Sequence, residues 1–274
     1  MRTHGYLAIG LMILITAAWL PFPATAADDP QARAIMERVD ARDDGDNQTA
    51  DMQMVLIDKR GKKRVRRIAT FKKDKGEDIL RLMFFLTPAD VKDTAFLTYD
   101  YDDPDRDDDQ WLYLPALRKT KRIATSDKSG SFMGSDLNYS DMTSRNLADY
   151  DYSFYEKGKT AEVRGNKVWV IWSVPRSKDV IDETGYAKSL LFIREDIDMV
   201  VRAISWEESG GYLKYLDMRK VEQIDGIWVA TETLVTRKRG KATVHKTVLT
   251  LENVKFNQGL DADMFTIRRM EKGL

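Results

Sequence analysis

Cysteine is absent from the 274-residue sequence, which excludes disulfides, thiolate metal sites, cysteine nucleophiles and lipid anchors attached to cysteine. Histidine is nearly absent: beyond the leader described below only His245 remains, so a zinc site built from several imidazoles is excluded. Net charge is absent too, because 44 Lys and Arg balance 44 Asp and Glu. A dedicated nucleic-acid binder would be clearly basic. We therefore expect no nucleic-acid partner, and nothing in the composition indicates a metal or another cofactor.

The first 26 residues have the three-part layout of a secretory signal peptide. A short basic start precedes an apolar run at 5–20, and small residues at 24–26 mark a cleavage site. The run is short for a membrane span, which needs about 20 residues. We therefore expect cleavage and export to the periplasm of one domain, residues 27–274. The alternative is an uncleaved membrane anchor.

After the leader, the apolar pattern predicts one helix and then a long series of strands. Ala32, Ile35, Met36 and Val39 recur at helical spacing after Pro30. Strands are expected at 49–58, 63–73, 79–86, 94–101, 110–114, 118–123, 151–157, 167–175, 186–194, 200–207, 212–221, 227–237 and 242–255. This steady spacing, with glycine in several turns, predicts a mostly β (α+β) domain with one large antiparallel sheet, curved or rolled.

Two segments break the strand rhythm. Residues 124–148 are rich in Ser, Gly, Asp and Met, and Ser140 is a plausible cap for a short helix ending at Leu147. Near the end of the chain, residues 261–265 resemble one helical turn before a final short strand.

Several of the predicted strands are apolar on both faces, which a sheet with one solvated face does not allow. The runs at 79–86, 168–172 and 190–193 are examples. Such strands need cover on both sides. A packed core provides it, and so does an apolar ligand held in the concave side of the sheet; the pattern alone favours the packed core.

Three motifs carry a resemblance to a known family. The run WLYLPALRK at 111–119 with KRI at 121–123, followed by SGSFMGSD at 129–136, resembles the LolA-like outer-membrane lipoprotein-sorting proteins. LNYSDM at 137–142 extends the match, and residues 254–266 resemble an ending shared more widely by such folds.

The resemblance implies an incomplete, strongly curved antiparallel barrel with helices covering its concave side. It implies an apolar cavity for the acyl chains of a lipid or lipoprotein, and carriage between the envelope membranes without covalent chemistry. Transient membrane contact and a partner permease of the resistance-nodulation-division type in the inner membrane are also implied.

Methionine and aromatic side chains suit such a cavity, because methionine adapts to varied apolar shapes. The residues expected to line it come from a strand and turn and from a segment taken as a lid: Trp111, Tyr113, Leu114, Leu117, Phe132, Met133, Leu137, Tyr139 and Met142. The alternative is that these side chains pack the core under a loop.

Two basic clusters are candidates for contact with anionic groups. Arg118 and Arg122 are expected to meet a lipid phosphate or acidic groups of a partner, the alternative being a solvated strand face. A second basic run, at 59–67, surrounds a hairpin tip. It can touch anionic headgroups or an acidic partner, although a solvated hairpin is the favoured interpretation.

Signals for catalysis are weak. His245 lies in mid-strand without an obvious orienting partner, and in residues 130–134 the serine comes second rather than third, unlike a nucleophile elbow. The acidic loop 102–109 departs from a calcium-binding loop. We therefore expect no enzyme. A lipid-sensing envelope regulator and, less favoured, a carboxylate-dependent envelope hydrolase remain as alternatives to the carrier.

Overall fold

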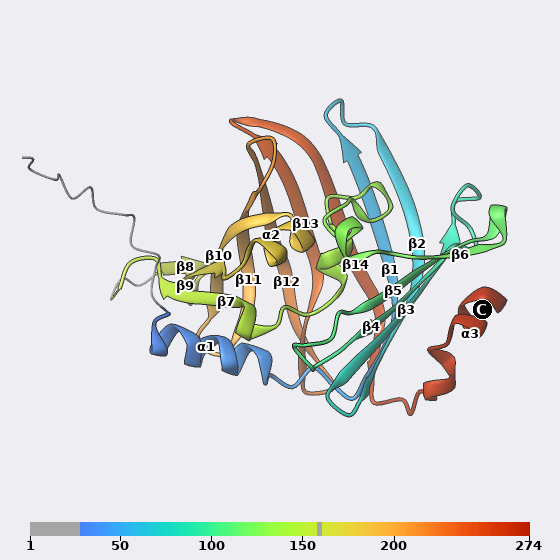
Figure 1. Cartoon of the computed structure of the whole chain (residues 1–274), viewed down its shortest axis with the longest axis horizontal. Helices are drawn as coiled ribbons and strands as arrows, with labels where there is room; N and C mark the ends of the chain where they lie inside the picture. Colours follow the sequence, from blue (N-terminus) through green and yellow to red (C-terminus); the bar gives the residue numbers. More distant parts are fainter. Residues whose placement is uncertain (1–27, 158–160) are drawn as a thin grey trace, which may run out of the picture.

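The computed structural model describes residues 28–157 and 161–274, and the expected signal peptide lies outside the described residues. One antiparallel sheet of 14 strands dominates the fold, with strand order β6-β5-β4-β3-β2-β1-β14-β13-β12-β11-β10-β9-β7 and β8 paired to β9. The sheet is curved, and it stays open because its two edge strands, β6 and β7, do not pair with each other (Figure 1). The predicted incomplete barrel is confirmed.

The strands form two series along the chain: β1–β6 come before the irregular stretch at 125–149, and β7–β14 come after it. They are β1 (Asn47–Asp58), β2 (Lys63–Lys75), β3 (Asp78–Thr87), β4 (Ala95–Asp100), β5 (Asp109–Leu114), β6 (Lys119–Arg122), β7 (Tyr150–Phe154), β8 (Ala161–Val163), β9 (Asn166–Pro175), β10 (Tyr186–Arg194), β11 (Met199–Glu207), β12 (Tyr212–Ile224), β13 (Ile227–Arg239) and β14 (Ala242–Phe256). The α-helices are α1 (Pro30–Asp40), α2 (Lys178–Thr184) and α3 (Ile267–Lys272). None of the helices described is long and apolar enough to span a membrane.

The pairing of β1 with β14 joins the two halves of the chain into one sheet. Its register runs from Gln48 opposite Phe256 to Asp58 opposite His245, with one bulge near Asp51. All other neighbours in the sheet are joined by antiparallel pairing close in sequence. A local meander therefore needs only this one long-range closure to become a continuous sheet.

Both faces of the sheet are covered, as the apolar strands require. In β3, Leu82 and Phe84 pack with Met270 of α3 on the convex face, whereas Phe85 points to the concave face. On the concave side, α1 packs through its buried Ile35 and other apolar residues on β7, β9 and β10. Asp29 caps this helix by accepting hydrogen bonds from the first-turn amides, so the predicted first helix is confirmed.

Two local expectations are wrong. No α-helix spans 140–147. Asn138 and Asp141 form a capping box around a short 3-10 turn, η4 (Tyr139–Met142), and the helix does not continue beyond it. The Asp141 carboxylate also forms an ion pair with Lys214. The final strand expected after residue 265 is instead α3. Thr266 caps it, and its buried Met270 packs against the convex face.

Candidate functional site

The hollow of the sheet holds an irregular stretch, residues 125–149, which we call the concave-side segment (green in Figure 1). It contains the short 3-10 turns η2 (Thr125–Asp127), η3 (Phe132–Gly134), η4 and η5 (Leu147–Asp149). Its backbone bonds to itself: Phe132 N donates to Leu137 O (2.7 Å), and Tyr139 N donates to Gly130 O (3.0 Å). The segment is therefore attached to the sheet mainly through its side chains.

One attachment is apolar. Phe132 is fully buried, with its ring centroid 5.0 Å from that of Phe96 and 6.3 Å from that of Phe85. Leu137 is buried in the same cluster, which we call the concave cluster. The segment's half-buried Met133, Tyr139 and Met142 pack against it, together with Leu114 from β5. Six of the nine predicted lining residues thus meet on one apolar surface, which the segment itself covers.

The other predicted lining residues lie elsewhere. Trp111 and Tyr113 alternate with the concave residues of β5 and pack with Phe265 and Met270 on the convex face. Leu117 stands in the turn η1 (Pro115–Leu117) between β5 and β6, with 62% of its surface exposed. Strand alternation therefore separates residues that the WLYLPALRK motif places next to one another in sequence.

The two predicted basic contacts differ in their surroundings. Arg118 has a left-handed backbone (φ 47°) just after η1 and is exposed. Arg122 is exposed as well, but its guanidinium bonds to the Asp109 carboxylate across the β5–β6 pair. Arg118 is therefore the freer of the two to meet an anionic group.

A polar attachment joins the concave-side segment to β14. The Asp136 carboxylate, only 2% exposed, accepts a hydrogen bond from Thr247 Oγ1 (2.7 Å) and lies 2.7 Å from His245 Nδ1. Thr247 Oγ1 also accepts from Asp136 N (2.9 Å). The expectation that His245 lacks an orienting partner is wrong: the last residue of the SGSFMGSD motif is that partner, and their separation of 109 residues hid it.

A second polar attachment reaches β10 and β12. Asp141 pairs with Lys214 (3.3 Å) and Arg145 (3.4 Å) and accepts from the Tyr186 hydroxyl (2.8 Å). Burial alone would raise the pKa of the Asp141 carboxyl, but Lys214 and Arg145 outweigh it and hold that pKa below its usual range. The carboxylate is therefore ionised at neutral pH, and the network fixes the middle of the segment. The network could not be predicted from the sequence, since Tyr186 and Lys214 lie in strands far along the chain from Asp141.

Two further contacts tie the segment at its start and tip. Lys128, 1% exposed, pairs with Glu183 of α2. Arg66 of β2, also buried, donates to the Met133 carbonyl oxygen (2.6 Å). Met133 has a left-handed backbone (φ 50°), and the Arg66 contact helps to hold that strained tip against the sheet.

A polar pocket of about 470 Å³ opens beside these attachments, between the concave-side segment, α2 and β12–β14. His245, Lys214 and Arg237 contribute to its wall, and Ser131 and Ser135 also line it. Its cations are already paired, Lys214 with Asp141 and Arg237 with Glu207. Both serine hydroxyls donate to backbone carbonyls of the segment. These contacts therefore hold the segment in place, and neither hydroxyl donates to a base that would make its serine an activated nucleophile.

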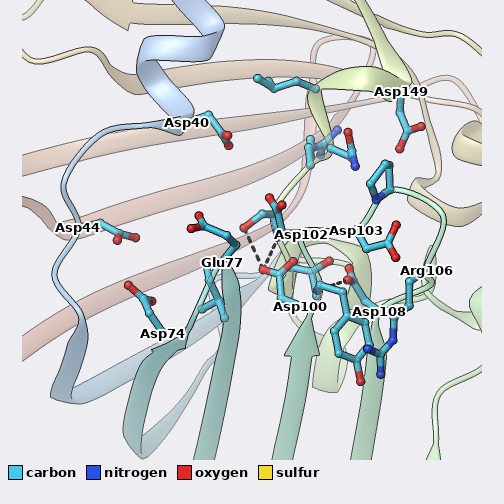
Figure 2. A pocket seen from close by; sticks show the side chains of 18 of the residues that line it. Asp40, Asp44, Asp74, Glu77, Asp100, Asp102, Asp103, Arg106, Asp108 and Asp149 are labelled. Atoms are coloured by element: carbon cyan, nitrogen blue, oxygen red, sulfur yellow. Dashed lines mark hydrogen bonds between the residues drawn. The ribbon is translucent and has the colours of Figure 1, made fainter. Parts of the chain in front are cut away.

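An acidic pocket of about 530 Å³ lies near the C-terminal end of α1, and Figure 2 shows its carboxylates turned toward a shared space. The acidic residues that line it are Asp40, Asp43, Asp44, Asp46, Asp74, Glu77, Asp100, Asp102, Asp103, Asp107, Asp108, Asp149 and Glu183. Burial, assisted by Asp100, raises the pKa of Asp108 to about 6. Among the described residues, no group of three or more His, Cys, Asp or Glu is arranged to hold a metal ion.

An apolar pocket of about 780 Å³ lies at the other edge of the sheet, near β8 and β9. Phe154, Tyr155, Trp169, Leu190 and Phe192 form much of its wall. Its volume falls in the range of small-molecule sites. None of the residues predicted from the family motifs lines it, so it is an apolar surface separate from the concave cluster.

The comparisons with known proteins agree with this architecture. A family model described as "Uncharacterized protein" matches residues 77–272, more than half of the chain. A domain from Vibrio parahaemolyticus assigned as an outer membrane lipoprotein-sorting protein is 28% identical (TM-score 0.78), covering 88% of this chain and 98% of that one. A DUF1329 family protein from Desulfovibrio piger is also 28% identical (TM-score 0.80), with 89% and 99% covered. No curated protein matches in sequence.

A more distant similarity concerns the fold alone. A LolA superfamily protein from Nitrosomonas europaea is 18% identical with a TM-score of 0.64, and the alignment covers 86% of this chain and 98% of that one. The similarity extends over nearly the whole of each solved structure, so it includes both the sheet and the cover of its hollow.

Proposed function

Because the chain belongs to the LolA-like family of outer-membrane lipoprotein-sorting proteins, we propose that it is a periplasmic carrier that shelters the acyl chains of a lipid or lipoprotein. The concave cluster is the binding surface in this proposal. The concave-side segment occupies it in the structure and shifts when an acyl chain enters, so that the apolar side chains of the segment then line the chain together with the sheet. The protein would then pass its cargo between the envelope membranes, working with an inner-membrane export permease.

One observation carries the proposal. The concave cluster is covered by an irregular segment that bonds its own backbone to itself and inserts Phe132 and Leu137 into the sheet's apolar face. A strand paired in the sheet could not leave the hollow without breaking backbone hydrogen bonds to its neighbours. This segment can leave by giving up side-chain contacts, and an incoming hydrocarbon chain replaces those contacts in kind.

The energetics allow such an exchange. Each CH₂ group that leaves water contributes about 0.8 kcal/mol, so a chain of ordinary length gains on the order of 10 kcal/mol. That gain opposes the cost of exposing the segment's apolar side chains, so an acyl chain can compete with the segment for the concave cluster. The half-buried Met133 and Met142 adapt to varied chain shapes, which suits a carrier of more than one acyl group.

The experiment is uptake of a fluorescent fatty acid by the purified protein. Met133→Asp places a charge at the edge of the concave cluster and should weaken uptake by more than about tenfold, because burying a charge costs several kcal/mol. Leu137→Asp should do the same if its β-rich circular dichroism survives. Tyr155→Asp is the matched control: it puts the same charge into the apolar edge pocket and should leave uptake unchanged.

Parental uptake by Met133→Asp would refute the concave cluster as the binding surface. Loss of uptake in Tyr155→Asp alone would place the acyl chain in the edge pocket instead. Carriage is then tested by extracting labelled lipid from one vesicle population and delivering it to another; uptake without delivery would indicate a sensor rather than a carrier.

A further inference from the structure

Although the net charge of the chain is zero, acidic and basic residues gather at opposite ends of the strands. The acidic pocket lies at one end of the sheet, where the β2–β3 turn and the β4–β5 loop meet the C-terminal end of α1 (Figure 2). The β1–β2 and β13–β14 hairpin tips lie at the other end, since antiparallel strands place alternate turns at opposite ends of a sheet (Figure 1).

The register of β1 with β14 brings these two hairpin tips together. Asp58, the last residue of β1, lies opposite His245, so the turn that follows β1 is beside the start of β14. Together the two hairpins expose a set of cations that we call the basic edge: Lys59, Arg60, Lys62, Lys63, Arg64, Arg67, Arg239 and Lys241. Within the described part of the chain, none of these side chains takes part in an ion pair. The Asp58 carboxylate at the same tip accepts hydrogen bonds from the backbone amides of Arg60 and Lys62, and the more numerous cations leave the basic edge with a net positive charge.

Exposed aliphatic side chains accompany the cations. Val65 is 44% exposed between Arg64 and Arg67, and Leu86, from the neighbouring β3, is 37% exposed. The turn between β5 and β6, with the exposed Leu117 and Arg118, lies at the same end of the sheet. Cations next to exposed aliphatic groups are typical of surfaces that rest on a membrane, where the charges meet headgroups and the apolar groups enter the boundary below them.

We propose that the basic edge is a docking surface for the anionic headgroups of a phospholipid membrane. Its cations are spread over two hairpin tips rather than gathered around one acidic partner site, whereas a membrane surface accepts any arrangement of positive charge. The acidic pocket at the opposite end repels the same membrane and so orients the molecule with the basic edge toward it.

This inference deepens the proposed function and rests on it for its purpose. Arg66 lies in β2 between the cations of the basic edge and holds the tip of the concave-side segment through the Met133 carbonyl. A docked protein therefore presents the tethered tip of that segment to the membrane, at the end where an acyl chain would enter or leave the concave cluster.

The test is co-sedimentation of the purified protein with vesicles of phosphatidylglycerol mixed with phosphatidylcholine, compared with vesicles of phosphatidylcholine alone. The parent should bind the anionic vesicles only, and about 1 M salt should release it. The basic-edge variant Lys59→Gln/Arg60→Gln/Lys62→Gln/Lys63→Gln should bind at least about a hundredfold more weakly, since each basic residue near an anionic surface contributes about fivefold.

The control variant removes the same number of exposed positive charges elsewhere, as Lys75→Gln/Lys167→Gln/Lys255→Gln/Lys272→Gln. It should bind like the parent, within about twofold. An equal loss in both variants, equal binding to both kinds of vesicle, or no binding by the parent would each overturn the proposal; the last would point to an acidic protein as the partner. Uptake of a fluorescent fatty acid without vesicles should be unchanged in the basic-edge variant, so failure of docking is distinguished from failure of acyl-chain binding.

Discussion

His245 Nδ1 lies 2.7 Å from Asp136 Oδ2, and this contact connects the concave-side segment to the middle of the sheet. Asp136 is almost fully buried, and the hydroxyl of Thr247 shares the same carboxylate oxygen. A buried carboxylate needs such partners, because an unpaired one would be costly in an apolar interior. The segment is therefore positioned by a few polar contacts, each of which contributes substantially to stability, in addition to its apolar side chains.

Asp136→Ala should destabilise the protein by about 1–3 kcal/mol, because Thr247 Oγ1 and the His245 ring lose their buried acceptor. Urea unfolding followed by circular dichroism measures the change. Ser126→Ala, an exposed position in the same segment, is the control and should stay within about 0.5 kcal/mol of the parent. Equal stability of the two variants would mean that the contact does not anchor the segment.

Lys214→Met should be more damaging, by about 3–5 kcal/mol, since it leaves the Asp141 carboxylate buried beside Tyr186 with only Arg145 for charge. Adding Asp141→Asn should restore part of the loss by removing that charge. Because the pKa of Asp141 is held below its ordinary value, its stabilising contribution is present at neutral pH and is lost as pH falls below about 4. Urea titrations of both variants at neutral pH measure the recovery, and a double variant as unstable as Lys214→Met alone would contradict the ion-pair explanation.

Periodicity in the sequence was sufficient to predict most of the architecture. The strand runs, the first helix and one large curved sheet follow from alternation, turn residues and cover on both faces, whereas the open, incomplete barrel was implied by the family resemblance. Two local starts were predicted wrongly: Asn138, rather than Ser140, begins the turn η4, and Thr266 begins a helix where a strand was expected. Capping depends on which side chain reaches which amide, and the residue type alone does not determine that.

The candidate site was only partly predictable, for a geometric reason. Phe132, Leu137 and Met142 could be grouped because they lie in one short segment that enters the hollow as a unit. Trp111 could not be assigned correctly to a face, because a strand with apolar residues on both sides gives no indication of which side is concave. Asp136 with His245, and Asp141 with Lys214, are pairs distant in sequence that form only once β1 and β14 close the sheet.

The two faces of the sheet should respond differently to mutation. Met270→Ala removes a fully buried side chain from the convex face and should cost about 2–5 kcal/mol in stability. Uptake of the fluorescent fatty acid should nevertheless match the parent at a temperature where both proteins are folded, since α3 does not contact the concave cluster. Reduced uptake by the folded variant would show that the convex face takes part in binding.

Asp108 provides a pH-dependent test of the acidic pocket. Burial and the nearby Asp100 raise the pKa of its carboxyl to about 6, above the ordinary value of 3.8. Between these two values the folded protein holds a proton that the unfolded chain has lost, so the contribution of Asp108 to stability falls as pH rises from about 4 to 6 and stays unfavourable above that.

Asp108→Asn removes this titration and keeps an oxygen that can accept the hydrogen bond from Tyr101 N (2.9 Å). The variant should match the parent near pH 4 and exceed its free energy of unfolding by an amount of order 2 kcal/mol at pH 7. Asp105→Asn, at an exposed position of the same loop, is the control and should show no such divergence. Urea titrations at pH 4, 5, 6 and 7 measure the difference, and a gap between Asp108→Asn and the parent that does not change with pH would contradict the raised pKa.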